Sequence, residues 1–424
     1  MTAHLESLAS FIQASPSSYH AVAEVARQLS AAGFSELVET DAWDPAAGDH
    51  FVLRDGAIVA WRQPTSAGPT TPFRIVGSHT DSPGFKLKPR PTTSTAGWVQ
   101  AGVEVYGGPL FNSWLDRELE FAGRLAFRDG TTALVRTGAL LRFPQLAVHL
   151  DRGVNSEGLK LDPQRHLNPV VGLGDVDHAD LIGHLARLAG QSGAEVAGLD
   201  VSVADTQPPA VFGLDDVFFA SGRLDNLSSV HSSLAAFLAA SAATESTPRS
   251  IQVLAAFDHE EVGSETRSGA SGPFLADILN RIAAGLGASD PDRLRAFAAS
   301  WCLSADAGHA VHPNYPEKHD PINRPVVGRG PLLKINANQR YATDALGAAE
   351  WSRACEAVGV EYQEFVSNNA VPCGSTIGPL TATRLGIRTI DVGLPLLSMH
   401  SARELAGSAD PEKFATAIGS FLAG

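Results

Sequence analysis

The fold of this chain is decided by the stretch Ser250-Ile251-Gln252-Val253-Leu254-Ala255-Ala256-Phe257-Asp258-His259-Glu260-Glu261. Its apolar part is short and contains β-branched residues, which is typical of a buried strand. Four polar side chains follow the strand directly. In open α/β sheets, ligands bind beyond the carboxyl ends of the strands. The stretch therefore predicts an α/β fold in which this strand delivers polar residues to a binding site.

Other apolar runs of the chain lead into polar residues in the same way. The run 73–77 leads to His79 and Asp81, the run 301–304 leads to Asp306, and the run 389–393 leads toward His400. Asp225, in Arg223-Leu224-Asp225-Asn226, is placed where a loop enters a helix. Because strand ends meet at one edge of such a sheet, we expect these distant segments to converge.

The pattern of apolar and turn-forming residues changes between Pro89 and Gly213. Short β-like runs there are separated by Gly, Asp and Pro, and none of the polar clusters above falls within it. This pattern predicts a β-rich domain inserted into the α/β domain. We expect a catalytic domain formed by residues 1–90 and 214–424, with the inserted domain at residues 91–213.

The composition limits the class of protein. The 424 residues include 44% hydrophobic and 18% charged residues, as in an ordinary globular protein, and the net charge is −14. A chain this acidic is a poor partner for nucleic acid or an anionic membrane. The three cysteines show no pairing pattern, and the N-terminal residues do not resemble a secretory signal. We therefore expect a cytoplasmic protein.

The polar clusters together supply the ligands of a two-metal hydrolase. Imidazole and carboxylate groups are common ligands of divalent metals, and such sites often hold two ions. The candidate metal ligands are His79, Asp225, Glu261, Asp306 and His400. Glu260 is left over as a general base that accepts the proton of the attacking water.

Each candidate also has an ordinary structural interpretation. His79 and Asp81 lie two residues apart, so Asp81 can orient the imidazole, but glycines and prolines around them also fit a turn. Asp225 can bridge two metals or cap a helix. The pair Glu260-Glu261 fits a solvated acidic loop as well as a metal site, and a lone His400 is more often structural. The metal hypothesis depends on the coincidence of all of them at the ends of elements.

The ordered motifs of the chain resemble those of the M18 family of metallo-aminopeptidases, the aspartyl aminopeptidase group. The resemblance runs nearly from end to end, and its motifs are Ser15-Pro16-Ser17-Ser18-Tyr19-His20, Gly77-Ser78-His79-Thr80-Asp81-Ser82-Pro83, Ser221-Gly222-Arg223-Leu224-Asp225-Asn226, Asp258-His259-Glu260-Glu261-Val262-Gly263-Ser264, Ser304-Ala305-Asp306, His309-Ala310-Val311-His312-Pro313-Asn314-Tyr315, Gln339-Arg340-Tyr341, Pro372-Cys373-Gly374-Ser375-Thr376-Ile377-Gly378-Pro379 and Met399-His400-Ser401.

The resemblance implies a fold and a set of site residues. The fold would be a phosphorylase/hydrolase-like zinc-peptidase catalytic domain with an inserted β-rich dimerisation domain. Two Zn²⁺ ions, with Co²⁺ or Mn²⁺ as substitutes, would be held by His79, Asp225 and Asp306 and by Asp225, Glu261 and His400. Glu260 matches the family's base and Asp81 its supporting acid.

The resemblance also implies substrate-binding residues, which are His149, His309, Lys334 and Tyr341. His149 matches a family histidine that reaches the active site of a neighbouring subunit, whereas the sequence alone favours a buried core histidine. Lys334 would be an ordinary surface lysine without the family pattern; with it, we expect an ion pair with an acidic substrate side chain.

The resemblance thus implies an aminopeptidase that removes one N-terminal residue from short peptides and prefers Asp or Glu. It also implies a homo-oligomer, a dodecamer built from dimers. Three alternatives stay open: an aminopeptidase of the same mechanism that prefers neutral or apolar residues, a two-zinc amidohydrolase acting on N-acyl amino acids, and a shell with structural metals.

Overall fold

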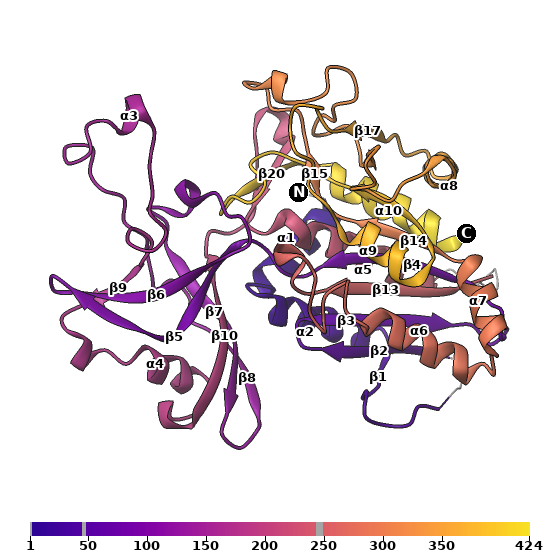
Figure 1. Cartoon of the computed structure of the whole chain (residues 1–424), viewed down its shortest axis with the longest axis horizontal. Helices are drawn as coiled ribbons and strands as arrows, with labels where there is room; N and C mark the ends of the chain where they lie inside the picture. The colour runs from indigo at the N-terminus through magenta and orange to yellow at the C-terminus, as the bar shows by residue number, and fades with distance from the viewer. Residues whose placement is uncertain (1, 45–47, 243–248) are drawn as a thin grey trace.

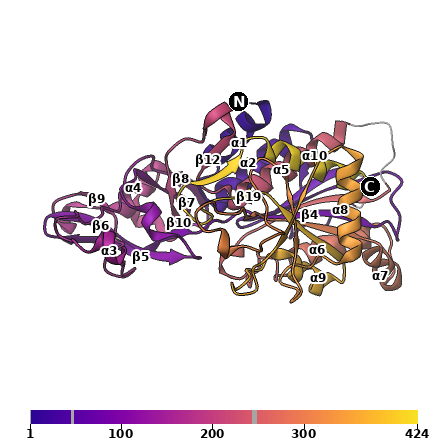
Figure 2. The same ribbon diagram turned by 90° about the horizontal axis from the view of Figure 1, so that it is seen from above.

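The computed structural model describes residues 2–44, 48–242 and 249–424. Two lobes are visible in Figure 1, an α/β lobe that contains both chain ends and a β-rich lobe at its side. Figure 2 shows from above that the two lobes make the molecule elongated. No helix among the described residues has the length and apolarity that crossing a membrane requires.

A mixed sheet of nine strands forms the centre of the α/β lobe. In spatial order its strands are β1 (Ser35–Glu36), β2 (Gly48–Arg54), β3 (Ala57–Gln63), β13 (Ile251–Phe257), β4 (Phe73–His79), β14 (Trp301–Ala305), β18 (Arg388–Gly393), β16 (Leu332–Ile335) and β17 (Gln363–Val366). Strands β13, β4, β14 and β18 are mutually parallel. Their carboxyl ends therefore meet at one edge of the sheet, as the sequence predicts.

Helices cover both faces of this sheet. One face is covered by α1 (Ala3–Ala14), α2 (Ser18–Ala31), α5 (Leu224–Ala242), α8 (Ala345–Ala357) and α10 (Asp410–Ala423), and the other by α6 (Phe274–Gly285), α7 (Asp290–Ala298) and α9 (Ile377–Leu385). Alternate residues of a strand point to opposite faces. In β13, Leu254 and Ala256 pack into the first layer, while Val253 and Ala255 pack into the second. This double burial explains the continuous apolar run.

The β-rich lobe is built on a second sheet, which is antiparallel. Its strands, in spatial order, are β8 (Thr132–Arg136), β7 (Leu119–Phe127), β10 (Val196–Asp205), β5 (Gly84–Thr95), β6 (Trp98–Tyr106) and β9 (Val170–Leu173), and its helices are α3 (Val154–Glu157) and α4 (Leu181–Leu188). It has its own core around Phe85, Phe121 and Phe143. Strand β5 already begins at Gly84, and the domain division at residues 91 and 213 stays a prediction.

Two small sheets complete the fold. One contains β11 (Ala210–Phe212), β12 (Phe218–Ser221) and β20 (Glu404–Gly407), and the other pairs β15 (Gly308–His309) with β19 (Pro395–Leu396). Local sequence signals account for two features near the N-terminus. Ser17 caps α2 by accepting a hydrogen bond from the backbone N–H of His20, and β2 and β3 form the hairpin around Asp55-Gly56.

Candidate metal centre

The candidate ligands lie at the shared edge of the central sheet. His79 is the last residue of β4, Asp306 follows β14, and Asp225 lies in the first turn of α5, where its dihedral angles are not helical. Glu261 follows β13 in a single 3-10 turn, and His400 precedes β20. Segments that are far apart in the sequence thus bring their polar side chains to one place.

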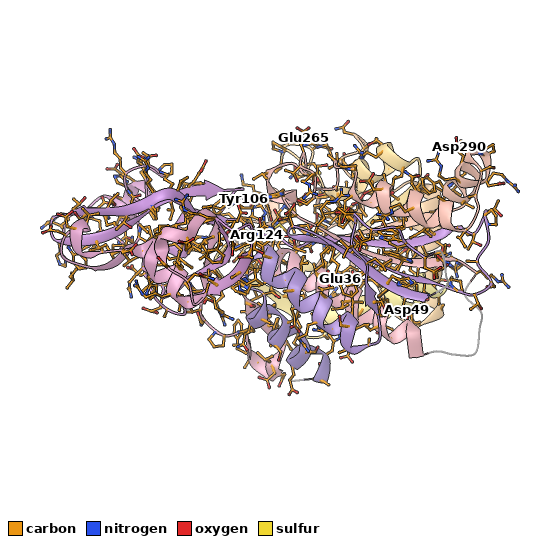
Figure 3. All side chains as sticks on the ribbon, turned by 90° about the horizontal axis from the view of Figure 1, so that it is seen from below. Glu36, Asp49, Tyr106, Arg124, Glu265 and Asp290 are labelled. Carbon is orange, nitrogen blue, oxygen red and sulfur yellow. The ribbon has the colours of Figure 1, made fainter. Side chains whose placement is uncertain are left out.

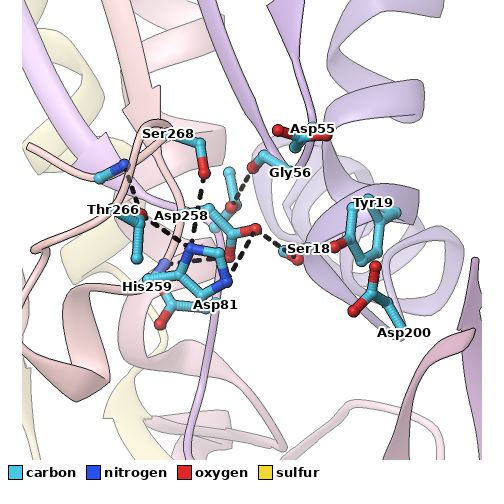
Figure 4. Close-up of polar contacts among 12 residues, drawn as sticks. Ser18, Tyr19, Asp55, Gly56, Asp81, Asp200, Asp258, His259, Thr266 and Ser268 are labelled. Atoms are coloured by element: carbon cyan, nitrogen blue, oxygen red, sulfur yellow. Dashed lines mark hydrogen bonds and ion pairs between the residues drawn. The ribbon is translucent and has the colours of Figure 1, made fainter. Parts of the chain in front are cut away.

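The turn after β13 aims two adjacent acids at this place. His259 has a left-handed backbone with a φ of 64°, which is uncommon for a residue other than glycine, and Gly263 closes the turn with a φ of 99°. The imidazole of His259 forms a hydrogen bond of 3.0 Å with Thr266 Oγ1. Figure 4 shows His259 and Thr266 beside Asp81 and Asp258. The strained turn is therefore held by its own side chains.

The first group of candidate ligands surrounds the imidazole of His79. Its Nε2 atom lies 3.5 Å from Asp225 Oδ1 and 3.6 Å from Asp306 Oδ1. Glu260 Oε2 is 3.9 Å from the same nitrogen. His79, Asp225 and Asp306 are all buried.

The second group surrounds the imidazole of His400. Its Nε2 atom lies 3.4 Å from Glu261 Oε2 and 3.5 Å from Asp225 Oδ2. Asp225 therefore presents one carboxylate oxygen to each group. A carboxylate in this position is able to bridge two cations.

The donor atoms of these groups fit divalent metal ions. In each group of three, the ligand atoms lie within 4.8 Å of one another. Two carboxylate oxygens, Asp225 Oδ1 and Glu261 Oε1, are buried and accept no hydrogen bond from any part of the chain that the structure describes. Such orphan acceptors are costly unless a cation or water satisfies them. The set of imidazoles and carboxylates is one that zinc prefers.

Hydrogen bonds orient both imidazole rings. The Nδ1 atom of His79 lies 3.1 Å from the carbonyl oxygen of Asp81, and that of His400 lies 3.1 Å from the carbonyl oxygen of Gly108. A carbonyl acceptor requires the proton to be on Nδ1, which leaves Nε2 free to bind a metal. In both residues, Nε2 is the atom that faces the carboxylates of the other candidate ligands.

The electrostatics of the site reflect its density of acids. Burial raises the pKa of Glu260 to about 8, an effect that Asp306 and Asp225 increase and His79 opposes. Burial and Asp225 raise the pKa of Glu261 well above its usual value. Burial lowers the pKa of His79, but the neighbouring carboxylates of Asp225, Asp306 and Asp81 more than reverse this effect. Carboxylates that crowd in this way without full solvation are stabilised by cations.

A cavity of about 410 Å³ opens onto the ligand groups. His309, Lys334 and Tyr341 line it, together with Gly374, Ser375 and Thr376. Lys334 is buried; its ammonium donates a hydrogen bond of 2.6 Å to the carbonyl oxygen of Ala307 and lies 4.0 Å from Asp306 Oδ2. Three of the four predicted substrate-binding residues therefore share one cavity with the candidate ligands.

Comparison with known proteins places this arrangement in a family. The family model described as "Aminopeptidase I zinc metalloprotease (M18)" matches residues 11–422. The chain belongs to the M18 family. It is a metallo-aminopeptidase, a hydrolase, and zinc is the metal of the family.

Individual M18 proteins resemble the chain over nearly its whole length. The probable M18 family aminopeptidase 2 of Streptomyces coelicolor is 54% identical over 99% of this chain and 97% of its own. The solved structure of Ape4 in complex with Nbr1 has a TM-score of 0.93 and 34% identity, covering 99% of this chain and 85% of that one. The mApe1 dodecamer of S. cerevisiae has a TM-score of 0.85 and 28% identity, covering 98% and 95%. The M18 fold is thereby shown.

His149, the fourth predicted substrate-binding residue of this M18 chain, lies away from the cavity. His149 is exposed in the loop between β8 and α3, and it does not line the cavity of its own chain. Leu146, Val148 and Leu150 beside it are also exposed, with Leu150 at 75%. The alternative of a buried core histidine is therefore wrong.

The structure adds an acid to the M18 site that sequence reasoning missed. Glu404 is buried, and its two oxygens accept hydrogen bonds from the backbone N–H groups of Asp225 (2.9 Å) and His400 (2.8 Å). Burial and the neighbouring Asp225 raise its pKa to about 8. Glu404 thus holds the backbones of two candidate ligands, and its place four residues after His400 was the only signal for it.

Proposed function

We propose that each subunit binds two zinc ions, one held by His79, Asp225 and Asp306 and the other by Asp225, Glu261 and His400. The observation that carries this proposal is that Asp225 presents a different oxygen to each imidazole, at 3.5 Å in both cases. Co²⁺ or Mn²⁺ would occupy the same donor set as substitutes. Zinc content of the purified protein tests the number directly, and one ion per chain would contradict it.

The activity we propose is hydrolysis of the N-terminal peptide bond of short peptides. Zinc supplies Lewis-acid chemistry, which polarises the carbonyl group and makes water more acidic. Glu260 accepts a proton from the attacking water and returns it to the leaving amine. Its carboxylate is suited to this role because it lies within 4.8 Å of ligand atoms of His79 and Glu261, one from each group, and is only partly exposed. Asp81 holds the imidazole of His79, with its Oδ1 atom 3.3 Å from Nδ1.

For specificity, we propose a preference for N-terminal Asp or Glu. The ammonium of Lys334 lies in the cavity wall and has three N–H donors, one of which points to Ala307. The others are available in our proposal to pair with a substrate carboxylate, while His309 and Tyr341 shape the rest of the pocket. A charge-assisted hydrogen bond in a buried pocket discriminates strongly between acidic and apolar side chains.

A variant of Lys334 tests this preference. Lys334→Met keeps the length of the side chain and removes its charge, so the ratio of kcat/KM for Asp- over Leu-peptides should fall by about tenfold or more. Lys318→Met, at an exposed lysine, serves as the matched control. An unchanged ratio in Lys334→Met would contradict the acidic pocket.

A second candidate is an aminopeptidase of the same mechanism that prefers neutral or apolar residues. The contacts of Lys334 with Ala307 and Asp306 favour it, because a lysine that supports a candidate zinc ligand need not meet the substrate. Under this alternative, Lys334→Met lowers the zinc affinity and leaves the ratio between peptides unchanged.

We further propose a homo-oligomer, a dodecamer built from dimers, in a cytoplasmic location. The dodecamer of the similar yeast protein and the exposed apolar residues around His149 support the assembly. In this proposal His149 contributes to the active site of the neighbouring subunit. The free thiols of Cys302, Cys355 and Cys373 agree with a reducing compartment.

A further inference from the structure

A short segment of the β-rich lobe lies against the candidate metal centre. It consists of residues 106–110, Tyr106-Gly107-Gly108-Pro109-Leu110, and we call it the junction segment. It begins with the last residue of β6, and Figure 3 shows Tyr106 where the two lobes meet. The segment contacts three different parts of the centre.

The first contact is between Tyr106 and Asp81. The hydroxyl group of Tyr106 donates a hydrogen bond of 2.7 Å to Asp81 Oδ2. The same carboxylate accepts hydrogen bonds of 3.1 Å from the backbone N–H groups of Glu260 and Glu261, and its Oδ1 atom lies 3.3 Å from His79 Nδ1. Asp81 therefore positions one candidate ligand ring and the turn that carries both the base and another ligand.

The second and third contacts involve Glu261 and His400. Gly107 packs so closely that a Cβ atom there would lie 3.1 Å from the Cβ of Glu261. The carbonyl oxygen of Gly108 lies 3.1 Å from His400 Nδ1, and the N–H of Leu110 donates to the carbonyl oxygen of His400 at 2.9 Å. The junction segment thus also holds the ring and the backbone of His400.

The lobes have further contacts that do not involve this segment. Arg124 of β7 pairs with Asp55 of the β2–β3 hairpin at 3.1 Å, and it donates to the hydroxyl of Tyr19 in α2 at 3.4 Å. Its guanidinium group also lies over the ring of Tyr19, 4.3 Å from the centroid. Removal of one hydroxyl group from Tyr106 therefore leaves the lobes docked.

We infer that Tyr106 is a positioning residue for the metal centre, through which the β-rich lobe fixes the orientation of Asp81 and hence of His79, Glu260 and Glu261. The inference rests on the proposed two-zinc function. Without the hydroxyl group, Asp81 loses the only side-chain donor that the β-rich lobe gives it among the described residues. Partners that orient metal ligands typically change metal affinity or activity by about 10- to 100-fold when they are removed.

The test is Tyr106→Phe in the full-length protein, which removes the hydroxyl group and keeps the ring. Competition with a chelator should show zinc affinity lowered by about tenfold or more, and kcat should fall while KM for a peptide stays unchanged. The matched control is Tyr19→Phe, which removes a hydroxyl group from another contact between the lobes. It should keep the wild-type zinc affinity.

The outcomes separate this inference from the proposed function. A wild-type protein that does not hold two zinc ions overturns the two-zinc function itself. If the wild type holds two and Tyr106→Phe holds them equally well, only the positioning role is overturned. An equal loss in Tyr19→Phe also overturns it, because the effect would then come from docking of the lobes. A Tyr106→Phe chain that fails to fold counts against it too, since the inference assigns the hydroxyl group to the centre and not to the fold.

Discussion

At the residue scale, two adjacent glutamates have different surroundings. Glu261 lies 3.4 Å from the ring of His400, and its buried Oε1 atom has no hydrogen-bond partner among the described residues. Glu260 instead lies 3.9 Å from the ring of His79, and both glutamates line the cavity. The unpartnered oxygen of Glu261 beside His400 supports the proposal that Glu261 binds metal and Glu260 transfers a proton.

Glu260→Gln tests this division. The amide keeps the shape of the side chain but cannot accept the proton of the water, so kcat should fall by about 10²- to 10⁴-fold. Zinc content should stay at the wild-type level, because Glu260 is not a proposed ligand. Activity and bound zinc are measured on the same preparation.

The matched control is Glu265→Gln, at an exposed acid in the following loop. It should keep both activity and zinc. Full activity in Glu260→Gln, or loss of zinc from it, would be incompatible with a general base at this position.

At the element scale, the sequence predicted which segments converge but not how they are held. The apolar runs of β4, β13, β14 and β18 identified the sheet, because strands buried on both faces read as continuous apolar runs. The ligand-bearing ends followed from parallel pairing of these strands. Strand β4 extends to His79, beyond the predicted run, since its pairing with β13 continues there.

The supporting contacts of the site could not be predicted in the same way. Tyr106 meets Asp81 across a sequence separation of 25 residues, and Gly108 meets His400 across 292. These contacts depend on how the β-rich lobe docks, and no local pattern encodes that docking. The orientation of Lys334 toward Ala307 could not be predicted either, because it depends on a contact across a sequence separation of 27 residues.

The packing of α1 on α5 predicts a pH dependence away from the metal centre. His231 of α5 is buried and forms a hydrogen bond of 2.9 Å with Ser7 of α1. Burial and the neighbouring His4 lower the pKa of His231 from 6.5 to about 3. Glu412 of α10 faces His4 and acts to raise the pKa of His4. In the unfolded chain, His231 binds a proton below about pH 6.5. In the folded chain, its lowered pKa keeps it neutral down to about pH 3. The stability contributed by neutral His231 is therefore present above pH 6.5 and lost as the pH falls toward 3.

His231→Gln tests this sign. Its free energy of unfolding should decline less than that of the wild type between pH 7 and about pH 4.5. The control is His166→Gln at an exposed histidine, which should follow the wild-type curve. Urea unfolding at a series of pH values measures the difference, and a steeper decline in His231→Gln would contradict the assignment.

At the scale of the whole molecule, the position of His149 predicts sharing of residues between subunits. The residue lies outside the cavity of its own chain, in an exposed apolar loop of the β-rich lobe. If it serves a neighbouring active site, His149→Ala and Glu260→Gln should each be nearly inactive alone. Mixed assemblies contain sites that combine an intact Glu260 with an intact His149 from the partner chain.

Co-expression of the two variants tests this prediction. In isologous pairs that form at random, about a quarter of the sites would regain both groups. Activity should therefore reappear on mixing, at a level that tracks the fraction of mixed assemblies. Absence of recovery, with mixed assemblies verified by mass, would show that His149 does not act on a neighbouring site.

The central claim concerns the whole enzyme, namely a zinc aminopeptidase that prefers acidic N-terminal residues. The most direct measurement is release of the N-terminal residue from matched Asp-, Glu-, Leu- and Lys-peptides and their N-acetylated forms, after chelation and after zinc is restored. We predict no cleavage after chelation, and zinc-restored cleavage of free peptides that is fastest for Asp and Glu. Zinc-restored cleavage that is fastest for Leu would contradict the specificity, and zinc-restored cleavage of only the acetylated forms would contradict the aminopeptidase mechanism.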